Sequence, residues 1–383
     1  MKKIWYRLLF FLIIKIYFRG ITLSGNKEVL QENGVLYLAL HKNGAVDGWV
    51  YLSVLPPVDV MIAAQLTRNP LLKLFFHGIE VVRDKDGGER RGNLAAMSAC
   101  VNILAGGKNL LVFPEGTSTL GPKHLEFKEG AALIIRKYIA KTGKNLTVIP
   151  LGVYYDDPTR MGGKAEITIG PPIDISAKDT DIIHQNITLA LENQGVNVDS
   201  PEEYKALRRF ATAASLYGKT TYSAAIKTAR ANPALFKESE NYNKTAADKN
   251  LWKYKDVRVQ PRSIWGSLWT FIITAPFVLL AFIFNALPLA VGYICGRKFA
   301  DDINVISLWR IIPGATVFMV WIPVVLICGK LYGLAALMIS FLGFILYGAC
   351  KKHFISLVNY LKAPGLKKEF NLAREHAIKE ISQ

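Results

Sequence analysis

Residues 39–50 read A-L-H-K-N-G-A-V-D-G-W-V and close an apolar run, Val35 to Leu40, that has the length of a short buried strand. The stretch brings His41 and Asp47 close together in the chain, with a turn signal at Asn43-Gly44 between them. A carboxylate can hold a histidine ring in one tautomer, so that the second ring nitrogen is free to take a proton from a hydroxyl. The pair therefore predicts a general base at a strand end, just before a packed helix.

A structural interpretation of the same pair is that Asp47 caps a helix and His41 lies on the surface. Three further stretches favour the chemical interpretation, and each of them follows or closes an apolar run. They are G-I-E-V-V-R at 78–83, F-P-E-G-T-S at 113–118 and V-I-P-L-G-V at 148–153. Ligands of open α/β sheets bind outside the strand ends, so His41, Arg83 and Glu115 are expected to lie near one site.

In order and spacing these four stretches resemble the sequence blocks of the glycerolipid acyltransferases, a family that includes the glycerol-3-phosphate and lysophosphatidate acyltransferases. The resemblance covers roughly residues 5–195. It implies that the first block supplies a catalytic base and its carboxylate, the second an arginine for the acceptor phosphate, the third acceptor contacts, and the fourth packing near the acyl site. The matching residues are His41, Asn43 and Asp47, then Arg83, then Glu115, Gly116, Thr117 and Ser118, and last Pro150, with Lys128 as a second positive charge.

The spacing of the first block departs from the commonest form of the family. Five residues, Lys42 to Val46, separate His41 from Asp47, where four are usual. The longer pattern His-x-Asn-x-x-x-Asp looks like that of the fungal glycerol-3-phosphate acyltransferases and similar bacterial chains. The resemblance implies no bound cofactor and no metal, with an acyl-coenzyme A or acyl-carrier-protein thioester as the donor and a glycerol-phosphate hydroxyl as the acceptor.

Two other function classes stay open at this point. A hydrolase of lipid esters or thioesters could use the same His–Asp pair to activate water. A membrane scaffold with a degenerate site would also fit, and the extra residue between His41 and Asp47 is its only support in the sequence.

The composition of the chain indicates which classes of partner it binds. Its 383 residues carry a formal charge of +17 and are 51% hydrophobic, with a mean hydropathy of +0.22. No stretch resembles a nucleic-acid-binding motif, so anionic lipid, a phosphate-bearing substrate or an acidic carrier protein is the expected partner. The four cysteines lack the spacing of a metal or redox site and are expected to be reduced; they are Cys100, Cys295, Cys328 and Cys350.

Alternating strand-like and helical runs over residues 21–198 predict an α/β acyltransferase-type sheet flanked by helices. Strands are expected near 21–23, 35–40, 58–63, 80–82, 109–113, 147–154 and 165–169, and helices near 47–55, 70–76, 92–105, 129–142 and 180–193. Residues 1–20 predict an interfacial amphipathic helix, because the apolar run of about 11 residues is too short to span a bilayer. A core helix is the alternative for this segment.

The remaining chain divides by composition. Residues 199–262 predict a polar helical region, with a linker-like piece at 237–249, and residues 354–383 form a basic tail. Between them, residues 263–353 predict a membrane region. We expect a broken or re-entrant segment at 263–295 and a two-span hairpin at 308–349, divided at Gly329-Lys330, with the catalytic domain cytoplasmic by the positive-inside rule. Three full spans is the alternative.

Overall fold

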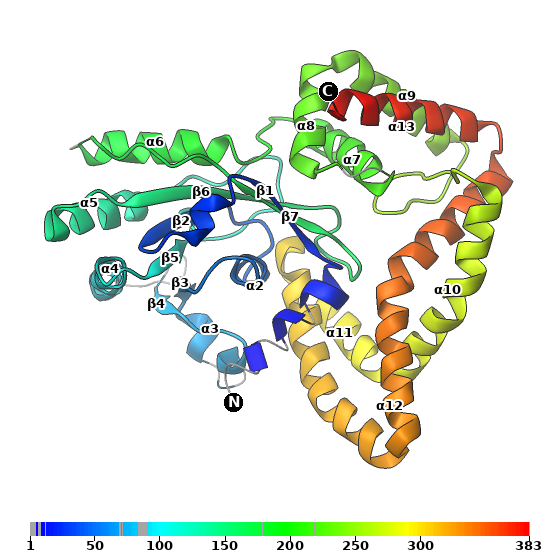
Figure 1. The fold of residues 1–383 in the computed structure, drawn as a ribbon, viewed down its shortest axis with the longest axis horizontal. Coiled ribbons are helices and arrows are strands. Elements are labelled where there is room, and N and C mark those ends of the chain that lie inside the picture. The colour runs from blue at the N-terminus through cyan, green and yellow to red at the C-terminus, as the bar shows by residue number, and fades with distance from the viewer. Residues whose placement is uncertain are drawn as a thin grey trace. The chain divides into compact units, whose positions relative to one another are not determined.

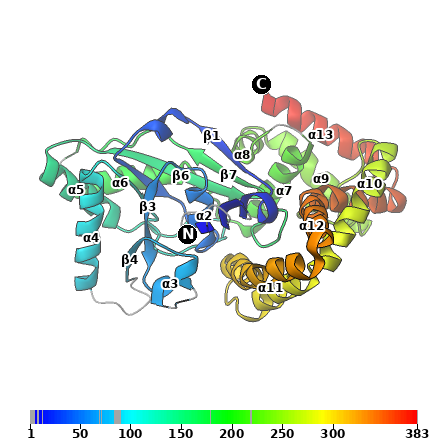
Figure 2. The same cartoon turned by 60° about the horizontal axis from the view of Figure 1, so that its bottom comes forward.

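The computed structural model describes residues 5–6, 9–11, 13–68, 70, 72–82, 90–177, 179–217 and 220–382. The chain divides into two compact units, each of which is drawn in Figures 1 and 2. The first unit is built from residues 1–11, 21–154 and 165–199, and the second from residues 12–20, 155–164 and 200–383.

A mixed sheet organises the first unit, and within the described residues it has seven strands in the order β1-β7-β6-β2-β5-β3-β4. The strands are β1 (Ile21–Gly25), β2 (Val35–Ala39), β3 (Val58–Ala63), β4 (Ile79–Val81), β5 (Asn109–Val112), β6 (Thr147–Tyr155) and β7 (Ala165–Ile169). Strand β2 lies in the centre, parallel to both β5 and β6, with Leu38 opposite Val112 on one side and Pro150 on the other. All seven lie where the sequence predicts them, and the predicted α/β class is confirmed.

Helices flank the sheet (Figure 2). They are α2 (Val46–Leu52), α3 (Gln65–Arg68), α4 (Arg90–Ala105), α5 (Gly130–Thr142) and α6 (Thr180–Glu192). The main core joins side chains of β2 and β5, such as Leu36 and Leu110, with Ile134 and Ile135 of α5. The helix expected near 70–76 is instead a short 3-10 turn, Leu72–Leu74, that follows α3.

Among the residues that the structure describes, four helices form the polar part of the second unit: α7 (Pro201–Tyr217), α8 (Tyr222–Ala231), α9 (Pro233–Asp248) and α13 (Leu366–Ser382). The linker-like interpretation of residues 237–249 is wrong, because almost all of this piece lies in α9. The side chain of Asn232 caps the helix by accepting from the Leu235 N–H at 3.2 Å. Tyr242 and Ala246 are buried on one face of α9, and the polar composition of the helix does not indicate this buried face.

Three apolar helices complete the second unit: α10 (Ile264–Phe284), α11 (Ala286–Lys298) and α12 (Ile306–Lys362). The first apolar segment breaks at Asn285, and α12 bends back at Lys330, whose φ of 47° and ψ of −123° are not helical. Helix α10 then runs beside the second arm of α12 (Figure 1), where any side chain at Gly343 would meet the Phe277 backbone.

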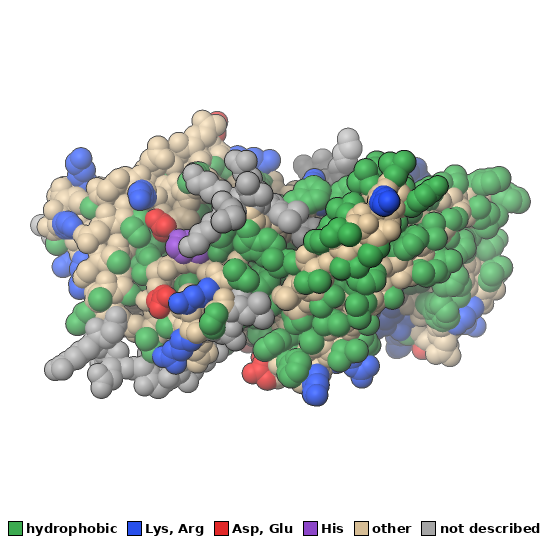
Figure 3. Space-filling model, turned by 90° about the horizontal axis from the view of Figure 1, so that it is seen from below, with side chains coloured by type: hydrophobic (Ala, Val, Ile, Leu, Met, Phe, Trp, Pro, Cys, Tyr) green, Lys and Arg blue, Asp and Glu red, His purple; other side chains and the backbone are tan. Residues whose placement is uncertain are grey.

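Length and composition mark two described helices as candidates to cross a membrane, one over 264–284 and one over 303–362. Helix α11 has 13 residues and so rises about 20 Å, less than the ~30 Å of a hydrocarbon layer. Figure 3 shows hydrophobic side chains over most of the visible face of these helices. Membrane insertion and its topology stay predictions.

The N-terminal segment is described only in part, since residues 1–4, 7, 8 and 12 lie outside the described residues. Leu9, Ile13 and Phe18 are buried, whereas Phe11 is 43% exposed. One-sided burial suits both the interfacial helix and its alternative, a core helix, so the interfacial role also stays a prediction.

Candidate active site

His41 stands directly beyond the carboxyl end of the central strand. The Leu40 N–H still donates to the Leu151 carbonyl at 2.9 Å, so the pairing of β2 with β6 holds His41 at the edge of the sheet. The chain then turns through Gly44, which has a φ of +55°, and enters α2 with Asp47 in the first helical turn. His41 Nδ1 lies 2.9 Å from Asp47 Oδ2.

The loop between the two residues wraps around the Asp47 carboxylate. Besides His41, Asp47 Oδ2 accepts the backbone N–H groups of Lys42 at 2.6 Å and Asn43 at 2.7 Å. The side chain of Asp47 is completely buried. The loop therefore accommodates the extra residue between His41 and Asp47, and this extra residue no longer supports a degenerate site.

This geometry fixes the histidine for proton transfer. A carboxylate at Nδ1 favours the tautomer in which Nδ1 carries the proton, so Nε2 presents a lone pair. The His41 side chain is 15% exposed, and its Nε2 makes no hydrogen bond to the described part of the chain. The ring stacks on Phe113 with centroids 4.4 Å apart and planes 25° apart, which limits its rotation.

Glu115 of the F-P-E-G-T-S stretch holds the backbone of the site. Its Oε1 accepts the His41 N–H at 2.8 Å and its Oε2 accepts the Leu125 N–H at 2.9 Å. The residue is only 2% exposed, and burial raises the pKa of its carboxyl, against the lowering effect of these hydrogen bonds. The sequence did not predict this positioning role; its predicted contact with acceptor hydroxyls stays a prediction.

The turn after Glu115 lies beside His41, because the Thr119 N–H donates to the His41 carbonyl at 3.1 Å. Gly116 has a φ of +67°, and a Cβ there would stand 3.3 Å from Lys128 Cε. Thr117 and Ser118 are half-buried on the same turn, and Lys128 is exposed. The structure thus places the turn that carries the predicted third-block residues next to the backbone of His41.

Lys42 is a charged residue of the site that the sequence reasoning missed. It is only 6% exposed and lies within electrostatic reach of the Glu115 and Asp47 carboxylates. Burial lowers the pKa of its ammonium, while the two carboxylates raise it. A lysine after a histidine has no signature in the sequence, so only the fold identifies it.

The predicted phosphate-binding residue Arg83 lies outside the described residues, but the backbone just before it is well defined. Asn93 of α4 accepts the Val82 N–H at 3.1 Å and donates to the Val82 carbonyl at 2.9 Å. Asn93 therefore fixes the end of the strand that leads to Arg83, and sequence reasoning missed it. Pro150 is buried in β6 opposite Leu38, on the strand next to the one that carries His41.

Comparison with known families matches the part of the chain that holds this site. Residues 20–154, which contain all four motifs, match the acyltransferase family model. This part of the chain therefore carries an acyltransferase domain, as the motifs predict.

Among solved structures, the chain is similar to the crystal structure of the 1-acyl-sn-glycerophosphate acyltransferase PlsC from Thermotoga maritima. The two share 17% sequence identity with a TM-score of 0.36, over 52% of this chain and 80% of that chain. No curated protein matches the chain.

Proposed function

We propose that the chain is a membrane-bound O-acyltransferase of phospholipid synthesis. It moves a fatty acyl group from an acyl thioester to a hydroxyl of glycerol-3-phosphate or lysophosphatidate. The single observation that carries the proposal is the contact of His41 Nδ1 with the buried Asp47 carboxylate at 2.9 Å, inside a matched acyltransferase domain.

In the proposed step, His41 Nε2 takes the proton of the acceptor hydroxyl as its oxygen attacks the thioester carbonyl. The buried Asp47 carboxylate stabilises the imidazolium that forms. When the tetrahedral intermediate collapses, the C–S bond breaks, the new C–O ester bond remains, and the imidazolium returns its proton to the leaving thiolate. No acyl-enzyme is required, because the acceptor oxygen attacks directly.

Positive charge near the base suits a phosphate-bearing acceptor. The resemblance assigns the phosphate contact to Arg83, and a guanidinium can meet a phosphate through two parallel hydrogen bonds. Lys128 is exposed, and its side chain lies against Gly116, so it supplies a second cation beside the turn that follows Glu115. The buried ammonium of Lys42 adds a third positive charge close to the carboxylates of the site.

The apolar helices of the second unit support a membrane location for this chemistry. Trp265, Ile273 and Ile327 are 72%, 61% and 76% exposed on helices that are long enough to enter a bilayer. We place these helices in the membrane and the catalytic domain on its cytoplasmic side. Extraction of membranes with high salt and with alkaline carbonate tests this placement, because an inserted chain remains in the pellet and a peripheral one is released.

The function is tested with membranes that contain the chain, a labelled acyl donor and a panel of acceptors. The proposal expects an acylated glycerol phosphate or phosphatidate, formed only when the matching acceptor is present. The donor arms compare coenzyme A with acyl-carrier-protein thioesters. Release of free fatty acid at the same rate without any acceptor would instead identify a hydrolase.

A further inference from the structure

Four basic side chains from separate parts of the sequence meet in the second unit: Arg19, Lys164, Lys255 and Lys352. The charges of Arg19 and Lys255 both act on Lys164, and those of Arg19 and Lys164 both act on Lys352. We call these four residues the basic cluster. None of them belongs to the site around His41.

The acidic residue within the basic cluster is already engaged. Asp156 Oδ2 pairs with Lys255 Nζ at 2.5 Å, and the two side chains are only 2% and 8% exposed. Asp156 Oδ1 accepts the backbone N–H of Lys164 at 2.6 Å. Arg19 and the Lys164 ammonium form no ion pair with an acid among the residues that the structure describes. The cluster therefore carries excess positive charge.

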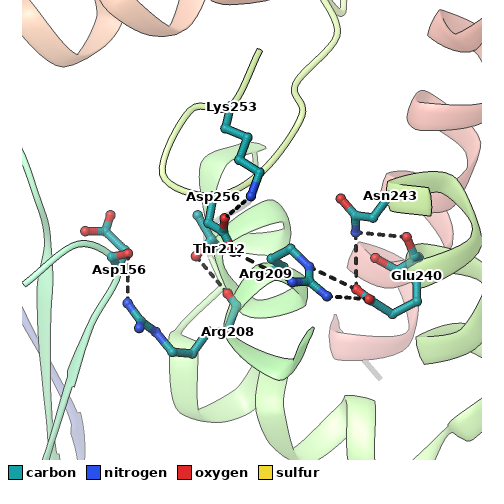
Figure 4. Close-up of polar contacts among 9 residues, drawn as sticks. Asp156, Arg208, Arg209, Thr212, Glu240, Asn243, Lys253 and Asp256 are labelled. Atoms are coloured by element: carbon teal, nitrogen blue, oxygen red, sulfur yellow. Dashed lines mark hydrogen bonds and ion pairs between the residues drawn. The ribbon is translucent and has the colours of Figure 1, made fainter. Parts of the chain in front are cut away.

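The loop that presents Lys255 is held in an unusual backbone conformation. Lys255 and Asp256 have φ values of 48° and 65°, in the left-handed region that non-glycine residues seldom adopt. Paired hydrogen bonds between Tyr254 and Val257 close the turn at 2.8 and 3.0 Å. Lys253 and Arg209 both bind the Asp256 carboxylate, as Figure 4 shows. This loop is fixed by specific contacts, so Lys255 is a positioned residue.

Arg19 is positioned just as specifically. Its own φ is +48°, and its guanidinium lies against Gly348 of α12, where a Cβ would overlap Nη1. Any side chain at position 348 would therefore displace the guanidinium. Lys352 follows Gly348 by four residues and so lies on the same face of the helix. The lack of a side chain at Gly348 brings two cations onto one helix face.

Like charges that lie close together repel one another. Partial burial lowers the pKa of Lys164, and the charges of Lys255 and Arg19 lower it further, against the raising effect of Asp156. An anion placed among Arg19, Lys164 and Lys352 would replace repulsion with charge-assisted hydrogen bonds.

The position along α12 indicates the source of the anion. Lys352 comes three residues after the end of the apolar stretch 331–349, at the level where a membrane helix meets the headgroups. Tyr347 and Lys351 lie at the same level, with Lys351 Nζ 5.7 Å from the centre of the Tyr347 ring. Tyrosine and lysine are typical of this interface.

We propose that the basic cluster is a binding site for the phosphate of an anionic phospholipid headgroup. The inference rests on the proposed membrane placement of α12 but not on the transferase chemistry. A lipid bound there would join the segment before β1, the loop between β6 and β7, and α12.

The test is a thermal-unfolding titration of the full chain in neutral detergent micelles, with phosphatidylglycerol, phosphatidylcholine or inorganic phosphate added. The proposal expects phosphatidylglycerol alone to raise the melting temperature. The variant Lys164→Gln should bind phosphatidylglycerol about fivefold more weakly, and Arg19→Gln/Lys164→Gln roughly 25-fold more weakly. The reason is that the loss of each cation near an anionic lipid weakens binding about fivefold. Removing the Lys164 charge lessens the repulsion within the basic cluster, so its single replacement should not lower the unliganded melting temperature.

The matched control is Arg297→Gln/Lys298→Gln, which removes two exposed basic residues from the end of α11. Equal weakening by the control pair would mean general attraction to negative charge and would overturn the site. If inorganic phosphate raised the melting temperature as much as phosphatidylglycerol does, the site would bind free phosphate and the proposed lipid ligand would be wrong. The titration needs no acyl donor, so an absent lipid response beside intact acyl transfer would refute this inference alone, and the reverse result would refute the proposed function alone.

Discussion

Replacing Glu115 with glutamine separates the two roles that this residue could have. Its two carboxylate oxygens accept the N–H groups of His41 and Leu125 at 2.8 and 2.9 Å, and the side chain is 2% exposed. A glutamine can turn its oxygen to only one of these donors, and its NH2 group then faces the other. Each hydrogen bond to a charged group contributes about 1.5–3 kcal/mol, and an unsatisfied buried N–H costs about 1–3 kcal/mol.

Because the variant no longer buries a carboxylate charge, part of this cost is offset, and we expect a net loss of about 2–4 kcal/mol. That loss should lower the melting temperature by roughly 5–10 °C, measured in detergent micelles. We expect kcat to fall about 10- to 100-fold, since the backbone of His41 loses its anchor. The KM for the acceptor should stay within about threefold.

The matched control is Glu126→Gln, which alters an exposed carboxylate in the same loop and should leave both readouts unchanged. An unchanged melting temperature for Glu115→Gln, together with a selective rise in the acceptor KM, would refute the positioning role. Glu115 would then contact acceptor hydroxyls, as the resemblance to the family implies.

Three further predictions concern the same site. Burial raises the pKa of Glu115, so its stabilising contribution is complete below the unfolded pKa and is lost as the pH rises through the folded pKa. Unfolding scans between about pH 4 and pH 8 should therefore show that the difference in free energy of unfolding between the parent and Glu115→Gln grows toward acid pH, and a constant difference would contradict this. Arg83→Ala should raise the KM for a phosphate-bearing acceptor far more than that for the donor, and Asn93→Ala should do the same more weakly; steady-state kinetics with equal effects on both substrates would argue for a purely structural role. Asp47→Asn should keep the ring of His41 in place but remove up to about 4 kcal/mol of charge stabilisation, roughly a thousandfold in kcat, and a loss below about fivefold would show that the carboxylate charge is unimportant.

Local sequence signals were sufficient for the sheet and for the order of the site residues. Each strand is a short apolar run bounded by turn residues, and parallel pairing of such runs brings their carboxyl ends to one edge. The carboxyl ends of β2 and β5 therefore place His41 and Glu115 side by side, as expected. The turn signal at Gly329-Lys330 likewise marked the bend of α12.

Burial and long-range hydrogen bonding could not be predicted from single residues. Glu115 resembles an exposed turn residue in the sequence, and Lys42 resembles a surface lysine, yet the fold encloses both. Helix α9 was missed because its polar composition hides the buried face that Tyr242 and Ala246 form. The pairing of Lys255 with Asp156 joins segments 99 residues apart, and no local pattern encodes such a contact.

The most direct test of the central claim, that His41 is the general base of an acyltransferase, is the acyl-transfer rate of His41→Ala. We expect a loss of about 10²–10⁴-fold in kcat. His124→Ala is the matched control, because His124 also stacks on a phenylalanine, Phe127, and lies 3.4 Å from a carboxylate, that of Glu192. If both variants melt near the parent temperature and His41→Ala alone loses activity, the account holds; if His41→Ala transfers acyl groups within a few-fold of the parent rate, His41 is not the base.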